Sequence, residues 1–296
     1  MLNKLVEQAL KKQPELIGLE DVVEKEILHH DIMFVLHKEG LLQGLTFIGG
    51  TSLRLCYDAS RLSEDLDFTA GLNFKAEKFS GLGDELKGYL VKKYGLNVSI
   101  HEPQLSKTNT STWKVTIEKH NDRPDLPSQK MHIDICSLPS FDIEHRPILD
   151  HFGIKSQLSG LPIPVQSLTE IMADKMLAFA YRERRIKPRD VWDIIWLKQQ
   201  RIKQSVELIT QKLSVRNKEP NDFISLITKH KFLILDDSNT KNDFEEEMKR
   251  FLPQSIAERT ILQPTFWDYA GKVIKEEVES AIDNLTTTDE ASGFKL

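Results

Sequence analysis

A pair of glycines at the end of a short apolar run constrains this chain more than any other feature. Residues 47–54 read Phe-Ile-Gly-Gly-Thr-Ser-Leu-Arg, so a predicted strand at 45–48 turns at once into a predicted helix at 51–57. Glycine lets the backbone approach an anion closely, and a helix N-terminus offers N–H groups and the positive end of a dipole. The sequence therefore predicts either a phosphate-binding corner or a tight turn with a capping hydroxyl. The residues concerned are Gly49, Gly50, Thr51 and Ser52.

Two carboxylates follow in a second apolar run, which predicts a strand at 66–69. Asp65 and Asp67 are spaced at i and i+2, so on a strand they would share one face about 6–7 Å apart along the chain. Carboxylates this close repel one another unless a cation lies between them, and Mg²⁺ prefers such ligands. The pair is a candidate metal site, and the alternative is the solvated face of an edge strand. Glu64 falls in the opposite register and is expected to point away.

A third acid, Asp134, lies in the alternating run at 131–136, which predicts another strand with His132 and Cys136 on the same face as the acid. On a strand beside Asp65 and Asp67, this carboxylate would complete a metal-binding triad and draw a proton from an attacking hydroxyl. The alternative is an ordinary surface acid. Because a triphosphate with its magnesium needs a phosphate-binding corner and carboxylates together, these motifs indicate chemistry on a nucleotide.

The second half of the chain contributes a group of charges. Lys175 and Arg182 are seven residues apart on a predicted helix at 167–186, so they share a face and could contact a triphosphate. The alternative is a pair of solvated cations on an amphipathic helix. The next predicted helix, at 188–199, begins at a proline and carries Asp190 and Asp193, one turn apart. With Arg189 these acids are expected to form an ion-pair network that orients Lys175; Asp190 would alternatively complement the helix dipole.

Basic residues outnumber acids between 182 and 203, the one such concentration in a chain of net charge −5. This stretch is the candidate contact for an RNA backbone. The acidic net charge argues against a general nucleic-acid coat. No apolar run approaches the ~20 residues needed to cross a bilayer, and the first residues do not resemble a secretory signal, so a cytoplasmic location is expected. Two cysteines are too few for a disulfide scaffold and are predicted to be buried thiols.

The overall pattern predicts an α+β protein of two domains, 1–160 and 161–296, with the change marked by glycines and prolines at 155–167. The first domain is expected to contain helices at 19–40 and 75–94, strands at 96–101 and 112–118, and a polar loop at 121–130. The second is expected to be helical, with further helices at 203–214, 220–230, 241–252 and 265–285, and a loose tail from Thr286.

Five motifs in this order resemble the AbiEii/AbiGii (MenT-like) nucleotidyltransferase toxins, which belong to the DNA polymerase beta-like nucleotidyltransferase superfamily. The similarity covers about residues 20–200 and depends on the combination rather than on any single motif. The motifs are Gly-Gly-Thr-Ser-Leu-Arg at 49–54, Arg61-x-Ser63-x-Asp65-x-Asp67-Phe68, the strand at 132–135, Lys175-x-x-Ala178-x-x-x-Arg182, and Arg189-Asp190-x-x-Asp193.

The resemblance implies a polymerase beta-like N-terminal domain with a mixed sheet, and a helical domain that completes the active site. It implies a toxin of a type IV toxin–antitoxin or phage-defence system that uses a nucleoside triphosphate and Mg²⁺ and modifies the 3′ end of tRNA or another RNA. A winged-helix antitoxin encoded nearby is the expected partner. Asp174 departs from the glutamate that relatives often have before the lysine.

Residue by residue, the resemblance assigns the phosphates to the corner at 49–52, with Arg182 and Asp190 as further nucleotide-binding candidates. It assigns metal to Asp65, Asp67 and Asp134, and catalytic roles to these three acids, Lys175 and Asp193. Two alternatives stay open. One is a nucleotidyltransferase that acts on a small molecule or a protein, and the other is a nucleotide-binding protein without turnover.

Overall fold

The computed structural model describes residues 1–103, 109–119, 127–182 and 185–293, and the side chains of 288–293 lie outside this description. The chain folds into two compact units. Unit 1 comprises Met1–Gln166 and Phe251–Gln254, and unit 2 comprises Ser167–Arg250 and Ser255–Leu296. Every strand of the described chain lies in unit 1, whereas unit 2 is helical, so the predicted α+β class is confirmed.

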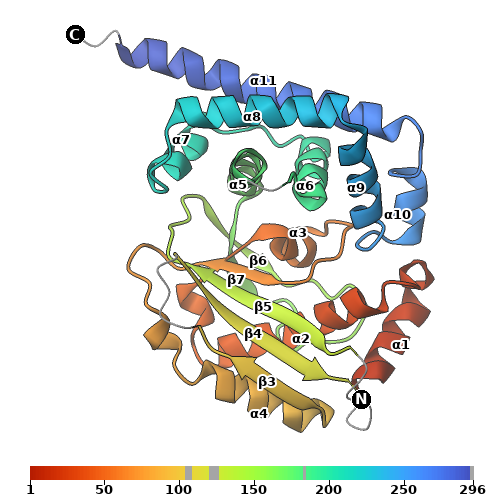
Figure 1. Ribbon diagram of the computed structural model, residues 1–296. Helices are drawn as coiled ribbons and strands as arrows, with labels where there is room; N and C mark the ends of the chain where they lie inside the picture. Colours follow the sequence, from red (N-terminus) through yellow and green to blue (C-terminus); the bar gives the residue numbers. More distant parts are fainter. Residues whose placement is uncertain (104–108, 120–126, 183–184, 294–296) are drawn as a thin grey trace. The chain divides into compact units, whose positions relative to one another are not determined.

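Unit 1 is organised around a seven-stranded mixed sheet with the strand order β3-β4-β5-β2-β1-β7-β6 (Figure 1). The central strand β2 pairs antiparallel with β1 and parallel with β5, and β1 also pairs parallel with β7. The strand bounds are β1 Thr46–Ile48, β2 Leu66–Thr69, β3 Asn97–His101, β4 Thr110–Glu118, β5 Gln129–Cys136, β6 Ile143–Pro147 and β7 Pro162–Gln166.

Alternating apolar residues bury one face of this sheet under helices of unit 1. Trp113, Ile133 and Phe68 are at most 1% exposed and pack in one core with residues of α2 and α4. Phe251 joins this core, and its carbonyl accepts the Leu62 N–H at 2.8 Å, although the residues before it belong to unit 2. The α-helices of unit 1 are α1 Leu2–Lys12, α2 Glu20–Lys38, α3 Gly49–Tyr57 and α4 Leu82–Tyr94, with 3-10 turns at Pro14–Leu16, Leu42–Gly44 and Ala76–Phe79.

Unit 2 is an assembly of helices. Ser167 caps the first of them by accepting the Glu170 N–H at 3.0 Å, and Pro188 opens the next, as expected for a proline at a first helical position. Phe244, Phe266 and Trp192 pack together in its core. The helices are α5 Leu168–Tyr181, α6 Pro188–Gln199, α7 Val206–Ser214, α8 Pro220–Asp236, α9 Ser238–Met248, α10 Gln254–Arg259 and α11 Phe266–Gly293. None of the helices in the described part of the chain is long and apolar enough to span a membrane.

Four elements were not predicted from the sequence: α1, α10, β6 and β7. Two prolines in β7 and the mostly exposed, polar residues of β6 hide the strand pattern. The expectation of a loose tail from Thr286 is wrong as far as Gly293, where α11 ends. Of the predicted loop at 121–130, residues 121–126 lie outside the described residues, and β5 already begins at Gln129.

Side chains of α2 anchor the segment that leads into β2. Lys25 Nζ lies 2.7 Å from Glu64 Oε1, and the buried His29 Nε2 lies 2.9 Å from the Glu64 carbonyl oxygen. Since a carbonyl accepts, this nitrogen of His29 is the protonated one in the neutral ring. Burial lowers the pKa of His29 to about 4, so His29 is uncharged at neutral pH.

Acid should therefore destabilise unit 1 partly through His29. Because the folded-state pKa lies below the ordinary value of 6.5, the unfolded chain binds this proton first, and stability is lost as pH falls from 6.5 towards 4. Between pH 7 and pH 5 we expect the free energy of unfolding of the wild type to fall by about 2 kcal/mol more than that of His29→Gln. The glutamine keeps a donor for the Glu64 carbonyl. Urea unfolding at both pH values measures the difference. His37→Gln, on an exposed histidine of the same helix, should show the same loss of stability between pH 7 and pH 5 as the wild type.

Candidate functional site

Two of the three predicted acids lie side by side in the sheet. Asp67 on β2 is the register partner of Asp134 on β5 in a parallel ladder, so both side chains emerge from the same face of the sheet. Neighbouring strands are about 4.8 Å apart, which puts the two carboxylates within reach of a single cation. The prediction that Asp134 lies on the strand next to the Asp65–Asp67 pair is confirmed.

Asp65 is placed differently from the prediction. It precedes β2, which begins at Leu66, and its Oδ1 accepts the backbone N–H of His132 at 2.9 Å. The His132 ring nitrogen Nδ1 lies 3.3 Å from the same oxygen. Among the described residues, no three acids, histidines or cysteines are grouped as they stand in a way that would hold a metal ion. The carboxylate of Asp65 is thus tied to β5, on the side from which Asp134 emerges.

The glycine corner lies directly against the acids. Helix α3 begins at Gly49, whose φ of +76° is a conformation that favours glycine, and no side chain caps the helix. A Cβ at Gly49 would lie 2.7 Å from Asp67 Oδ2, and one at Gly50 would lie 2.0 Å from a guanidinium nitrogen of Arg61. The missing side chains therefore leave room for Asp67 on one side and for the buried Arg61 on the other. The N–H groups of the first helical turn and the helix dipole suit this corner to an anion.

The two hydroxyls of the corner bond to the protein itself. Thr51 Oγ1 donates to the carbonyl of Asp65, and Ser52 Oγ donates to the carbonyl of Gly49 at 2.8 Å; both residues are at most 1% exposed. Both hydroxyl hydrogens are thus directed to backbone carbonyls of the site. Thr51 thereby fixes the start of α3 to the segment that carries the acids.

Thr112 belongs to this site and was not identified from the sequence. On β4 it is the register partner of Asp134, and its Oγ1 donates to Asp134 Oδ1 at 2.5 Å. A hydroxyl that donates to one carboxylate oxygen fixes the rotation of the carboxylate and leaves its other oxygen for a ligand. Only the strand register, which the sequence does not state, would have pointed to this residue.

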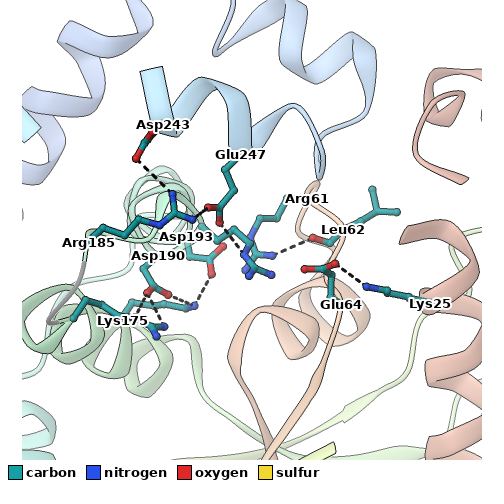
Figure 2. Close-up of polar contacts among 12 residues, drawn as sticks. Lys25, Arg61, Leu62, Glu64, Lys175, Arg185, Asp190, Asp193, Asp243 and Glu247 are labelled. Atoms are coloured by element: carbon teal, nitrogen blue, oxygen red, sulfur yellow. Dashed lines mark hydrogen bonds and ion pairs between the residues drawn. The ribbon is translucent and has the colours of Figure 1, made fainter. Parts of the chain in front are cut away.

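One cluster of charges in unit 2 surrounds the buried Lys175. Lys175 Nζ on α5 lies 2.9 Å from Asp190 Oδ1 and 2.7 Å from Asp193 Oδ2, and Figure 2 shows both acids reaching it from α6. Arg182 donates to the other oxygen of Asp190 at 3.1 and 3.2 Å. Although burial raises the pKa of Asp190, the charges of Lys175 and Arg182 lower it to about 2, so this acid is ionised. The predicted network around Lys175 therefore exists within unit 2.

Ion pairs also link α5 and α6 to other helices of unit 2. Arg189 pairs with Glu247 on α9 at 3.3 Å. Asp174, next in sequence to Lys175, extends to α7, where it lies 2.7 Å from Lys212 and 3.0 Å from Arg216. Lys212 is 1% exposed and also lies 2.8 Å from the fully buried Glu170. Helix α5 is thus bound by ion pairs on both sides.

Much of the basic stretch at 182–203 is neutralised. Arg185 pairs with Glu247 at 2.8 Å and with Asp243 at 3.5 Å (Figure 2), and Lys198 pairs with Glu277 at 2.6 Å. Burial and the nearby guanidinium groups lower the pKa of Lys187. Arg184 lies outside the described residues. Four cations of the stretch are thus paired with acids, whereas Arg201 and Lys203 are exposed and have no ion-pair partner in the described part of the chain.

A glycine corner beside paired acids, in a mixed sheet followed by a helical unit, is the arrangement expected of a nucleotidyltransferase. The chain belongs to the AbiEii family, since residues 31–272 match the model described as nucleotidyl transferase AbiEii toxin of type IV toxin–antitoxin systems. The resemblance predicted from the sequence is thereby confirmed.

Solved structures agree with this fold. MenT4, the nucleotidyltransferase toxin Rv2826c of Mycobacterium tuberculosis H37Rv, is similar with a TM-score of 0.54 and 16% identity over 96% of this chain and 99% of that one. JHP933 from Helicobacter pylori matches with a TM-score of 0.48 and 14% identity, over 91% of this chain and 97% of the other. No functionally curated protein matches the sequence. At 16% identity, the similarity to MenT4 shows the fold alone.

Proposed function

We propose that this protein transfers a nucleoside monophosphate from a nucleoside triphosphate to the 3′-hydroxyl of an RNA, with tRNA as the first candidate. The observation that carries the proposal is the register pairing of Asp67 with Asp134 beside the glycine corner at Gly49. Transfer of a nucleotidyl group to a hydroxyl needs a phosphate-binding element and a carboxylate near the attacking oxygen, and this corner of unit 1 supplies both.

The side chains fit a magnesium ion in their chemistry. Asp67 and Asp134 are hard oxygen donors on one face of the sheet, and the glycine next to Asp67 leaves its carboxylate accessible. We propose these two acids as metal ligands, with Asp65 as a third ligand held nearby by its bond to His132. When bound, Mg²⁺ supplies neutralisation of the charge on the triphosphate.

The residues of unit 1 then account for the transfer. The N–H groups at the start of α3 bind phosphate oxygens, and Asp134 accepts the proton of the 3′-hydroxyl as its oxygen attacks the α-phosphorus. A new P–O bond forms to the RNA, the bond from the α-phosphorus to the oxygen that bridges it to the β-phosphate breaks, and pyrophosphate leaves. Thr112 holds Asp134 in place during this step.

The cluster in unit 2 has a proposed role in nucleotide binding. Lys175 is a candidate phosphate ligand, Asp193 and Asp190 fix its position, and Arg182 is a second candidate ligand. Because two buried carboxylates hold the ammonium group, Lys175 has little freedom to move, which favours a fixed position for the charge. As members of type IV systems act with an antitoxin, we further propose a winged-helix protein encoded nearby as partner.

A labelled-nucleotide assay tests the proposal. The purified protein is incubated with Mg²⁺ and each of the four α-labelled triphosphates, with a deacylated tRNA pool, total protein or small-molecule acceptors in turn. We expect the label to enter tRNA and pyrophosphate to be released. Label in protein or in a small molecule would assign a different acceptor, and tight triphosphate binding without pyrophosphate release would make the protein a non-catalytic binder.

Replacement of Thr112 by valine should slow transfer without abolishing it. The variant keeps the shape of the side chain but loses the bond to Asp134, and a hydrogen bond to a charged group is worth about 1.5 kcal/mol, or about tenfold in rate. Single-turnover rates measure the effect. Ser111→Ala removes a hydroxyl from the adjacent residue of β4, which lies in the opposite register to Thr112, and should leave the rate unchanged; equal rates for both variants would contradict the role of Thr112.

A further inference from the structure

The sheet continues beyond the acids as an open polar surface. On β4, Lys114 is the register partner of His132, and Thr116 is that of Lys130, while Thr112 is that of Asp134. Register partners share a face, so these side chains emerge on the same side as the acids. On β3, His101 and Ser99 continue the same rows. We call this surface the outer face of β3–β4–β5.

The orientation of this face is fixed by the opposite one. Val115, Ile117 and Met131 alternate with the polar residues and are at most 1% exposed, in the core that contains residues of α2 and α4. A change of register by one residue would bury Lys114 and expose the apolar core residues. The polar residues are therefore fixed on the outer face and the apolar residues on the opposite face.

Two lysines of the outer face carry unneutralised charge. Lys114 and Lys130 are exposed, and neither has an ion-pair partner in the described part of the chain. Apart from the acids of the site, the described strands place one acid on this face, Glu118 at the far end, where it accepts a hydrogen bond from Asn97. The cations are therefore available to an anionic ligand.

These lysines lie along a path to Asp134. Lys114 is one strand away and two residues along from the level of Asp134, and Lys130 is four residues from it along β5, about 13 Å. Successive phosphates of an extended strand could meet first one lysine and then the other. By contrast, Arg182, Arg185 and Lys198 of the basic stretch are held by acids.

We propose that the outer face of β3–β4–β5 binds the acceptor RNA, with Lys114 and Lys130 contacting backbone phosphates behind a 3′ end that lies at Asp134. The inference rests on the proposed function for the identity of the polyanion. It moves the acceptor contact from the basic stretch of unit 2 to the sheet that carries the acids. Hydroxyls of Thr116 and Ser99 add donors for phosphate and ribose oxygens.

The test compares two double variants in binding to a deacylated tRNA pool, measured by fluorescence anisotropy at several salt concentrations. Lys114→Ala with Lys130→Ala removes the proposed contacts. Lys87→Ala with Lys92→Ala removes the same charge from exposed positions on α4, which packs on the opposite face of the sheet. Each phosphate contact contributes about 0.7 to the slope of log K against log salt. The first variant should therefore lose about 1.4 of the slope and bind about 25-fold more weakly at 0.1 M salt, whereas the second should match the wild type.

Binding and transfer are scored separately. Equal tRNA binding by the two double variants would overturn this inference even if the wild type labels tRNA. Loss of binding confined to the Lys114/Lys130 variant would support it even if no transfer is found, in which case the proposed function falls alone. A wild type that binds no tRNA and labels another acceptor would overturn both.

Discussion

Replacement of Asp67 by asparagine is expected to abolish nucleotidyl transfer. The change keeps the size of the side chain but removes the charge next to Asp134, where a cation and the triphosphate are proposed to bind. Loss of a metal ligand of this kind should raise the barrier by about 4 kcal/mol or more, which is about a thousandfold in rate. The rate of pyrophosphate release under single-turnover conditions measures it, and a thermal melt verifies that the fold is retained.

The neighbouring acid provides a matched control. Glu64 lies three residues before Asp67, and its carboxylate pairs with Lys25 on α2 at 2.7 Å rather than facing the site (Figure 2). Glu64→Gln should change the rate by less than about fivefold, because a partly exposed ion pair is worth about 1 kcal/mol at most. An Asp67→Asn variant with the activity of the wild type would exclude Asp67 from the reaction.

Replacement of Lys212 by methionine should give the largest loss of stability. Lys212 is 1% exposed and lies 2.8 Å from Glu170, which is fully buried, so the variant deprives a buried carboxylate of this cation. Breaking a buried ion pair in this way costs about 3–5 kcal/mol. Urea unfolding followed by circular dichroism measures the change. Since Glu170 lies on α5 with Lys175, this loss of stability should also affect the position of Lys175 and its ion pairs.

Two further variants test whether the buried ion pair causes the loss of stability in Lys212→Met. Arg216 contacts the same Asp174 at 3.0 Å but is more exposed, so Arg216→Met should cost less than about 1 kcal/mol. Adding Glu170→Gln to Lys212→Met removes the buried negative charge that Lys212 balanced and should recover part of the lost stability. If Lys212→Met were no more destabilising than Arg216→Met, the buried pair would not be a source of stability.

Local patterns sufficed for the elements around the site. The apolar run before Gly49 and the alternation around Asp134 predicted a strand, a corner and a neighbouring strand, because these depend on residues close in sequence. The bounds of β2 agree with the prediction. The position of Asp65 could not be predicted from local sequence, because its carboxylate is held by the backbone N–H of His132, 67 residues away.

The rest depends on pairings that no local pattern encodes. Thr112 joins the site through the register of β4 with β5, and Arg185 and Arg189 are neutralised by Glu247 from a distant helix. A concentration of arginines in the sequence therefore overstated the cationic surface of unit 2. Two lysines on separate strands, Lys114 and Lys130, share one face only through the pairing of β4 with β5, which no local sequence pattern indicates.

The return of the chain to the first unit at Phe251–Gln254 limits how the protein can be dissected. A fragment ending at Gln166 would lack Phe251 and with it the carbonyl that receives the Leu62 N–H. Cleavage at any one of the three junctions between the units would leave a nicked molecule in which at least one piece still contributes to both units. A chimaera that takes unit 2 from a relative should accordingly fold only when the four residues Phe251–Gln254 keep the sequence that matches unit 1.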